Sequence, residues 1–259
     1  MSSNYPLIHL SLAPGKKVFF ASDIHLGAPN KKQSRVREDK IVAWMKSIKP
    51  QTGALFLVGD LFDFWFEYKQ VVPKGYVRFL AEICHFVDEQ IPVFIFSGNH
   101  DIWMFDYLQD EIGAQVLRNP AIFNIQNIRF FVGHGDGLGP GDTKFKVLKK
   151  IFTFPIFQEM FSWLHPDIGI KLAQTWSNQS RTNPKDEKFM GEEKERLIAF
   201  AKEQIPLNPA SYYIFGHRHL PLQIEIYKDI QYINLGDWII NFTYLEFDGT
   251  HVVLKKYQP

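Results

Sequence analysis

Five short apolar runs of the sequence each lead to a side chain that can bind a metal ion. Each run has the length and the Phe, Val and Ile content of a buried β-strand. The residues that follow the runs are Asp23, Asp60, Asn99, His134 and His217. Ligand groups gather beyond the carboxyl ends of the strands in open α/β sheets. Because carboxylates, amide oxygens and imidazoles together suit Mn, Fe or Zn, the pattern predicts a metal site at that edge.

Two further histidines lie close to these positions. His25 comes two residues after Asp23, and His219 comes two residues after His217. The resulting seven groups are too many for one tetrahedral ion and are enough for two ions that share a carboxylate. Taken singly, an Asp after an apolar run is usually a turn residue, and a lone His is usually structural. The repetition at five run ends favours the metal site. Four histidines stay outside it as structural residues: His9, His85, His165 and His251.

The segments between these runs predict the elements that position the candidate ligands. Apolar residues within 41–48 and within 79–87 fall on one face of a helix, and the order strand, helix, strand indicates βαβ units. Later in the chain, strand-like runs flank short turns at 126–127, 228–229 and 248–249. Asp-Gly at the last of these is a strong hairpin signal. We therefore expect a mixed α/β fold with two mixed sheets packed together, helices outside, and antiparallel strands in the last third.

Residues 138–204 interrupt this alternation. They separate two strand-like runs by far more than an ordinary loop. The pattern at 143–153 is helical, and several aromatic residues follow it. We predict an inserted, aromatic-rich helical cap at 138–204, with residues 1–137 and 205–259 forming the main domain.

Five motifs, in order along residues 18–220, resemble those of the calcineurin-like metallophosphoesterase superfamily. They are Asp23-x-His25, Gly59-Asp60-x-x-Asp63, Gly98-Asn99-His100-Asp101, Gly133-His134-Gly135-Asp136 and Gly216-His217-x-His219. The resemblance implies a four-layer αββα sandwich and an enzyme that hydrolyses phosphoesters with two divalent metal ions. Bound cations of this kind clamp a phosphoryl group and lower the pKa of a water molecule toward about 7.

The resemblance also implies a role for each motif residue. One ion would be held by Asp23, His25, Asp60 and His219. The other would be held by Asp60, Asn99, His134 and His217, so that Asp60 bridges the two ions. The expected metal is Mn²⁺, and the same ligands accept Fe²⁺, Zn²⁺ or Mg²⁺.

The remaining motif residues would act on the phosphoryl group or support the site. His100 would stabilise the charge of the phosphoryl group or protonate the leaving oxygen. Asp101 would orient His100, by the logic of a carboxylate behind an imidazole. Asp63 is expected to be structural or to support the ligands.

Secondary motifs resemble the UDP-2,3-diacylglucosamine pyrophosphohydrolases of lipid A synthesis. They are the aromatic residues of 61–65, Asp142 after the third histidine motif, the long insertion, and Asn234-Leu235-Gly236-Asp237-Trp238. In that family the cap covers the acyl chains, and the products are UMP and 2,3-diacylglucosamine 1-phosphate. The resemblance implies substrate contacts from Asn99, His100, Asp142, Arg181 and His217.

The composition of the cap agrees with a lipid substrate. Lys149, Lys150 and Arg181 could meet phosphates or anionic lipid heads. Five aromatic residues could line a groove for acyl chains: Phe152, Phe154, Phe157, Phe161 and Trp163. The alternative is an insertion that simply packs on its own domain.

Two positions depart from the family pattern and keep other functions open. Well-known pyrophosphohydrolases of this family carry arginine where this chain has His100, whereas most other phosphoesterases of the superfamily carry histidine. Arg218 also stands where a small residue is usual. One alternative is a metallophosphodiesterase or phosphatase that acts on another lipid or nucleotide diphosphate. Another is a non-catalytic scaffold, which the retention of all seven ligands and His100 opposes.

Charge and composition exclude some partners. Lys and Arg number 29 and Asp and Glu number 28, so a global field that would hold nucleic acid is absent. The single cysteine, Cys84, forms no internal disulfide. A secretory signal is not expected, because residues 1–17 contain no long apolar run after a basic start. A membrane-spanning helix is not expected, because no apolar window reaches about 18 residues. The expected location is the cytoplasm, with peripheral contact to the inner membrane through the cap.

Overall fold

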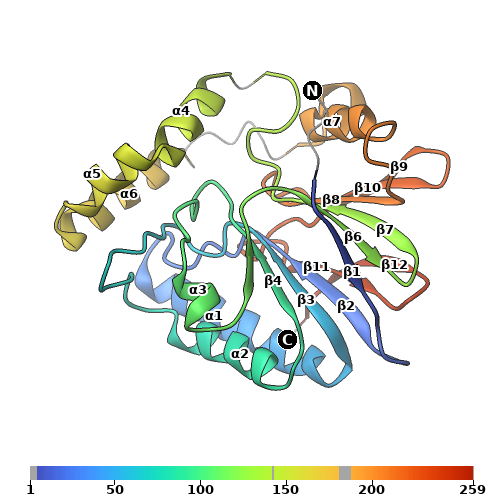
Figure 1. The fold of residues 1–259 in the computed structure, drawn as a ribbon, viewed down its shortest axis with the longest axis horizontal. Helices are drawn as coiled ribbons and strands as arrows, with labels where there is room; N and C mark the ends of the chain where they lie inside the picture. Colours follow the sequence, from blue (N-terminus) through green and yellow to red (C-terminus); the bar gives the residue numbers. More distant parts are fainter. Residues whose placement is uncertain (1–4, 142, 181–187, 259) are drawn as a thin grey trace.

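Two six-stranded β-sheets lie face to face at the centre of the molecule (Figure 1). The computed structural model describes residues 5–141, 143–180 and 188–258. The strand order is β1-β6-β7-β8-β10-β9 in the first sheet and β12-β11-β2-β3-β4-β5 in the second. The strands are β1 Leu7–Leu10, β2 Lys17–Ala21, β3 Thr52–Val58, β4 Val93–Phe96, β5 Gln115–Leu117, β6 Ala121–Ile125, β7 Ile128–Val132, β8 Tyr212–Phe215, β9 Leu222–Tyr227, β10 Ile230–Asn234, β11 Thr243–Phe247 and β12 Val252–Lys256. Each sheet contains parallel and antiparallel pairs, so the expectation of two mixed sheets is confirmed.

Helices cover both outer faces of the sandwich. They are α1 Lys31–Ile48, α2 Val77–Asp88, α3 Tyr107–Asp110, α4 Thr143–Thr153, α5 Pro155–Ser162, α6 Pro166–Ser180 and α7 Arg196–Gln204, with 3₁₀ turns at Lys49–Gln51 and Glu192–Lys194. The apolar faces of α1 and α2 pack on the second sheet, and α7 packs on the first. The expected four-layer αββα arrangement is therefore confirmed.

Successive side chains of the central strands enter two different apolar clusters, because each sheet is covered on both faces. In β3, Leu55 and Leu57 belong to the apolar cluster under α1 and α2, whereas Phe56 and Val58 belong to the cluster between the sheets. Successive side chains of a strand point to opposite faces, so a strand between a helix layer and a second sheet must be apolar throughout. Phe56 stacks on Phe20 with ring centroids 4.5 Å apart. This aromatic core fixes the strand ends that carry the candidate ligands.

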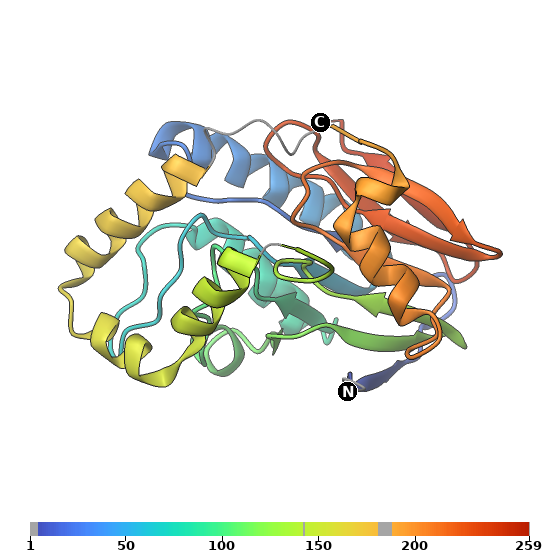
Figure 2. The ribbon, with the colours of Figure 1, turned by 90° about the horizontal axis from the view of Figure 1, so that it is seen from above.

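The insertion forms a separate layer of helices above one end of the sandwich (Figures 1 and 2). Helix α4 has the predicted bounds of 143–153. Phe152 and Phe161 of the insertion pack against a small cluster formed by Phe64, Phe66 and Trp103. Helix α7 lies within the range predicted for the cap but packs on the outer face of the first sheet. None of the helices in the described part of the chain is long and apolar enough to cross a membrane.

The three expected hairpins are present, and one strand begins later than the pattern suggested. Gln126 and Asn127 adopt positive φ values of 50° and 64° between the antiparallel strands β6 and β7, as a two-residue hairpin loop requires. The strand expected from residue 239 begins at Thr243. Its start is delayed because the Asp237 carboxylate accepts hydrogen bonds from the amides of residues 239, 240 and 241 and holds them in a turn.

Candidate metal centre

The ends of five strands meet at one edge of the sandwich. Strands β2, β3 and β4 of the second sheet lead to Asp23, Asp60 and Asn99, and strands β7 and β8 of the first sheet lead to His134 and His217. Within three groups of residues, the potential ligand atoms lie within 4.8 Å of one another: Asp23, His25 and His219; Asp60, His134 and His217; and His25, Asp63 and His100.

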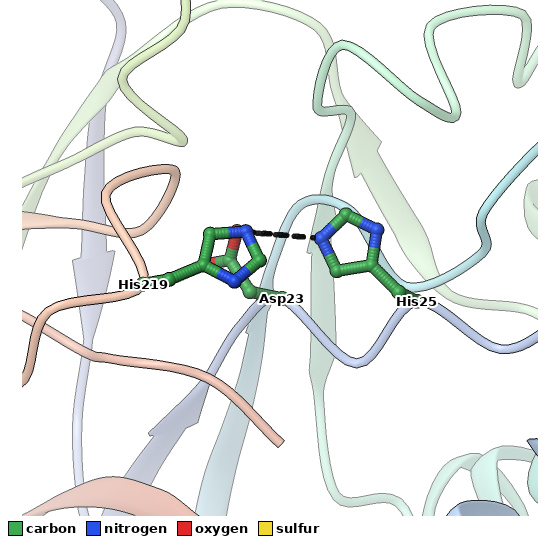
Figure 3. A group of neighbouring side chains, drawn as sticks. All are labelled: Asp23, His25 and His219. Atoms are coloured by element: carbon green, nitrogen blue, oxygen red, sulfur yellow. Dashed lines mark hydrogen bonds and ion pairs between the residues drawn. The ribbon is translucent and has the colours of Figure 1, made fainter. Parts of the chain in front are cut away.

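The first group joins the loops that follow β2 and β8 (Figure 3). His25 Nε2 lies 3.2 Å from His219 Nε2, and the latter nitrogen lies 3.2 Å from Asp23 Oδ1. The backbone amide of His217 donates to the Asp23 carboxylate at 3.0 Å, which ties the two loops together. Two imidazole nitrogens and a carboxylate oxygen thus converge, as the ligands of a divalent cation do.

The second group lies around His134. Its Nε2 is 3.2 Å from Asp60 Oδ2, and its Nδ1 is hydrogen-bonded to the Val58 carbonyl at 2.9 Å. A backbone partner of this kind orients an imidazole that binds a metal. Asn99 Oδ1 is buried and has no hydrogen-bond partner among the described residues. Since leaving such an oxygen unsatisfied is costly, a cation at this position would account for it.

Asp60 connects the two groups. Its Oδ2 atom is 3.2 Å from His134 Nε2 and 3.7 Å from His25 Nε2. Its Oδ1 atom accepts a hydrogen bond from the backbone amide of His100 at 2.9 Å. Asp60 is therefore the carboxylate that lies within 4 Å of an imidazole nitrogen of each of these two groups.

The backbone at these positions is held in a conformation that side chains seldom adopt. Asp23, His25, Asp60, His217 and His219 all have φ between 48° and 67°, which is the left-handed region. Such strain persists where surrounding structure enforces it and is common at functional sites. Five of the seven candidate ligands therefore lie on strained backbone.

Glycines that precede candidate ligands allow close approach between loops. A Cβ atom at Gly98 would collide with the Asp60 carboxylate, and one at Gly59 would collide with the His134 ring. The Gly-Asn and Gly-Asp pairs of the sequence therefore have a steric cause, because each glycine leaves room for a ligand from another strand.

Burial and neighbouring charge set the protonation of the centre. Burial opposes ionisation of Asp60, but His134, His100 and His25 hold its pKa well below the usual value. Burial acts to lower the pKa of His134, yet Asp60 raises this pKa well above its usual range. Burial, reinforced by His134, lowers the pKa of His217 to about 3. Since metals bind carboxylates and neutral imidazoles, the ionised Asp60 and neutral His217 suit a divalent ion.

Asp63 lies against the ring of His100. His100 Nδ1 is 3.1 Å from the Asp63 carbonyl oxygen and 3.6 Å from its carboxylate. The same carboxylate is 3.8 Å from His25 Nδ1. Asp63 therefore lies between His100 and a candidate metal ligand, a position that is compatible with the supporting role expected from the sequence.

Asp101 has a different set of partners from the expected one. Its two carboxylate oxygens accept hydrogen bonds from the backbone amides of Gly98 and Leu61, each at 2.7 Å. It thereby joins the loop after β4 to the loop after β3. These contacts assign Asp101 to holding the loops and give no support to the expectation that it orients His100.

Sequence reasoning missed several residues that hold the ligand loops. Arg37 of α1 donates from one guanidinium nitrogen to the carbonyls of Ile24, His25 and Ala28 at 2.7–3.2 Å. Asn241 donates to the His219 carbonyl at 3.0 Å. The helical pattern of 31–48 could have suggested that Arg37 faces inward, but its backbone partners are set by tertiary structure.

The motif at 234–238 also supports the ligands, which its sequence alone did not explain. Asn234 donates to the Gly216 carbonyl at 2.5 Å, and the Trp238 amide donates to the Asp23 carbonyl at 3.1 Å. The motif therefore holds the loops after β2 and β8 through their backbone.

The cap residues suggested by the sequence divide into anchors and exposed groups. Phe161 packs on Trp103 with ring centroids 4.7 Å apart, and the Trp103 indole donates to the Phe152 carbonyl at 2.8 Å. Phe154, Phe157 and Trp163 are exposed, Trp163 to 81%.

The basic residues suggested for the cap also include one that is anchored and one that is exposed. Lys149 bonds the Asp136 carboxylate at 2.5 Å rather than standing free, whereas Lys150 is exposed. Asp142 and Arg181, both suggested as substrate contacts, lie outside the described residues.

Comparisons with known proteins agree with this geometry. A family model described as calcineurin-like phosphoesterase matches residues 16–221. The chain is 34% identical over 254 residues to a UDP-2,3-diacylglucosamine hydrolase of Porphyromonas gingivalis, covering 93% of this chain and 97% of the relative. Relatives with the same name from Haemophilus ducreyi and Haemophilus influenzae are 24% and 25% identical, covering 85% and 88% of this chain and 91% and 92% of their own.

Proposed function

The chain belongs to the calcineurin-like phosphoesterase family, and we propose that it is a two-metal hydrolase that cleaves the pyrophosphate of UDP-2,3-diacylglucosamine. It is a metal-dependent hydrolase by family and by its candidate metal-binding groups. The observation that carries the proposal is Asp60, whose carboxylate contacts an imidazole of each group. The products would be UMP and 2,3-diacylglucosamine 1-phosphate.

We propose the same ligand assignment that the sequence suggested. One ion would lie among Asp23, His25, Asp60 and His219, and the other among Asp60, Asn99, His134 and His217. Bound divalent cations supply Lewis-acid polarisation of a phosphoryl group and a lowered pKa for water. The mixture of oxygen and imidazole ligands suits several ions, and Mn²⁺ is the proposed one.

The chain's own residues would orient the substrate and move a proton. Asp63 holds the His100 ring through Nδ1, which fixes the direction of Nε2. From Nε2, His100 would stabilise charge on the phosphoryl oxygens or protonate the leaving oxygen. Asn99 and His217 would contact the phosphoryl group as well as an ion. Asp142 and Arg181 remain proposed substrate contacts on the strength of the family resemblance.

Membrane contact through the cap is part of the proposal. Four apolar side chains in and just before α5 are between 45% and 61% exposed: Phe154, Ile156, Phe157 and Met160. Lys150, four residues before Phe154 in the sequence, is exposed as well. A group of exposed apolar residues with nearby basic charge suits the surface of an anionic bilayer. We propose peripheral contact of this kind at the inner membrane of a cell in which the protein is otherwise cytoplasmic.

The division of the chain into domains also remains a proposal. The sequence suggested a cap at 138–204 inserted between 1–137 and 205–259. Because α7 packs on the outer face of the first sheet, we propose that the part able to move relative to the sandwich is α4–α6.

Product analysis tests the substrate. The Mn²⁺-loaded protein is incubated with UDP-2,3-diacylglucosamine, and the products are identified by mass spectrometry, with Asp60→Ala as the control. UMP and the diacyl sugar phosphate from the native protein alone support the proposal. Cleavage of a simple aryl phosphodiester without cleavage of the lipid would instead favour a phosphodiesterase with another lipid or nucleotide diphosphate as substrate, an alternative that His100 keeps open.

A further inference from the structure

A basic cleft borders the metal centre next to Asp63. Its volume is about 1220 Å³, which is ample for a nucleotide because small-molecule pockets are typically about 300–1,000 Å³. One wall is the first turns of α1, and the other is the segment that leads into α2. Gly27 and Asp63 lie at the boundary with the metal centre, since the Asp63 carboxylate also faces His25 and His100.

The charge of the cleft favours an anion. Lys31 and Lys32 line the wall formed by α1, and Lys74 and Arg78 line the opposite wall. None of these four forms an ion pair with any residue in the described part of the chain. Cations that converge from two elements without protein partners are suited to phosphate.

The acidic residues that line the cleft are already engaged. Glu38 bonds Arg35 at 2.9 Å and accepts hydrogen bonds from the amides of Arg78 and Phe79 at 3.0 and 3.2 Å. It thus caps the start of α2. Asp63 faces two imidazoles. The lining therefore keeps its basic character.

Tyr76 adds a neutral hydrogen-bonding group to the cleft. Its hydroxyl lies over Gly27, where an added Cβ atom would come within 2.6 Å of it. This hydroxyl makes no hydrogen bond to the residues that the structure describes. Burial, reinforced by Glu38, raises the pKa of Tyr76 to about 12, so the hydroxyl keeps its proton at neutral pH and can donate it to an acceptor.

We propose that this cleft binds the nucleoside monophosphate half of the substrate, with Lys31, Lys32, Lys74 and Arg78 around its phosphate and Tyr76 as a hydrogen-bond donor. The inference rests on the proposed function, because it takes the nucleotide from that substrate. The polar walls of the cleft suit a nucleotide, whereas the exposed apolar residues of α4–α6 suit acyl chains. The two halves of the substrate would then extend in different directions from the metal centre.

The test is the affinity of the metal-loaded protein for UMP, measured by calorimetry at fixed ionic strength. In Lys74→Ala/Arg78→Ala we expect the Kd for UMP to rise about tenfold, because two charge-assisted contacts are lost. Tyr76→Phe removes only the hydroxyl and should raise the Kd by a smaller factor. The matched control, Arg129→Ala/Lys228→Ala, removes one arginine and one lysine from the first sheet and should leave the Kd within twofold.

Inorganic phosphate separates the cleft from the metal ions. Its Kd should rise less than that of UMP in the cleft variant, because free phosphate can bind at the ions without the nucleoside that holds UMP in the cleft. A UMP affinity that is equal in the cleft variant and the control would overturn the inference, and so would equal weakening of UMP and phosphate. The result is independent of lipid hydrolysis, so a protein that fails to cleave UDP-2,3-diacylglucosamine but shows the expected Kd values would refute only the proposed substrate.

Discussion

Two aspartates near His100 perform different tasks. Asp63 faces the imidazole rings of His100 and His25, whereas Asp101 accepts hydrogen bonds from the backbone of two loops. The sequence places Asp101 next to His100 and Asp63 far from it, so adjacency along the chain gave no sign of the contact between Asp63 and His100. The contact with Asp63 depends on two strand ends lying side by side, and nothing in the spacing of the motifs encodes that distance.

This division of tasks predicts the effect of replacing Asp63. Asp63→Asn should lower kcat for an aryl phosphodiester by about 10- to 100-fold, as is typical when the partner of a catalytic or metal-binding imidazole is lost. The measurement is steady-state kinetics at saturating Mn²⁺. In a His100→Ala background the same substitution should have little further effect on the proton-transfer step. Wild-type kcat in Asp63→Asn would contradict the role assigned to Asp63.

Several candidate ligands could be predicted from the sequence, because a short local motif is enough to identify them. The ligand types at Asp23, Asp60 and His134 follow from apolar runs that end in metal-binding side chains, and the structure brings them to one edge of the sandwich. Arg37 and Asn241 could not be foreseen, since they act through backbone carbonyls of distant loops. A polar side chain that donates hydrogen bonds to distant backbone carbonyls is not marked by any pattern in the residues around it.

At the level of elements, an ion pair links the last motif to helix α7. The guanidinium group of Arg218 bonds both carboxylate oxygens of Glu195 at 3.0 and 2.9 Å, and Glu195 directly precedes α7. The pair is largely buried, with side chains 13% and 4% exposed. It fixes the loop that carries His217 and His219 to a helix of the core, which gives a structural reason for an arginine where the family pattern has a small residue.

Breaking this pair should destabilise the protein. Arg218→Ala leaves the buried Glu195 carboxylate without its cation, and breaking a buried pair in this way typically costs about 3–5 kcal/mol. Thermal unfolding of the metal-loaded protein measures the loss. The double variant Glu195→Gln/Arg218→Ala should recover part of it, because the uncompensated charge is gone. Identical melting temperatures for Arg218→Ala and the native protein would show that the pair contributes nothing.

The cap helices give a separate prediction about membranes. Phe157 and Trp163 are 45% and 81% exposed, and burying a large apolar side chain contributes about 1.5–3 kcal/mol. Phe157→Glu/Trp163→Glu should therefore lower the binding to anionic phospholipid vesicles at least tenfold in a sedimentation assay, with kcat for an aryl phosphodiester unchanged.

A control for vesicle binding comes from exposed apolar residues of the sheets. Tyr227 on β9 and Val253 on β12 are 66% and 45% exposed, and Tyr227→Glu/Val253→Glu introduces the same charge. This control should bind vesicles like the native protein. The cap would not be the membrane contact if both variants lost vesicle binding equally, or if both bound vesicles like the native protein.

On the scale of the whole molecule, the sandwich explains why a single centre forms. The second sheet supplies Asp23, Asp60 and Asn99, the first sheet supplies His134 and His217, and the aromatic core between the sheets holds their ends at one edge. The mixed sheets, the hairpins and α4 followed from periodicity and turn residues. The edge strands β1 and β5 and the packing of α7 did not, because short edge strands have weak patterns and the partner of an amphipathic helix is set by tertiary structure.

The central claim is that Asp60 joins two metal ions in one centre, and the number of bound ions tests it most directly. The protein is stripped with a chelator, reloaded with Mn²⁺ and measured by native mass spectrometry. We predict two ions per chain in the native protein, one in His219→Ala or His134→Ala, and loss of the two-ion state in Asp60→Ala. A native protein that takes up a single ion, or an Asp60→Ala variant that retains two, would contradict the account.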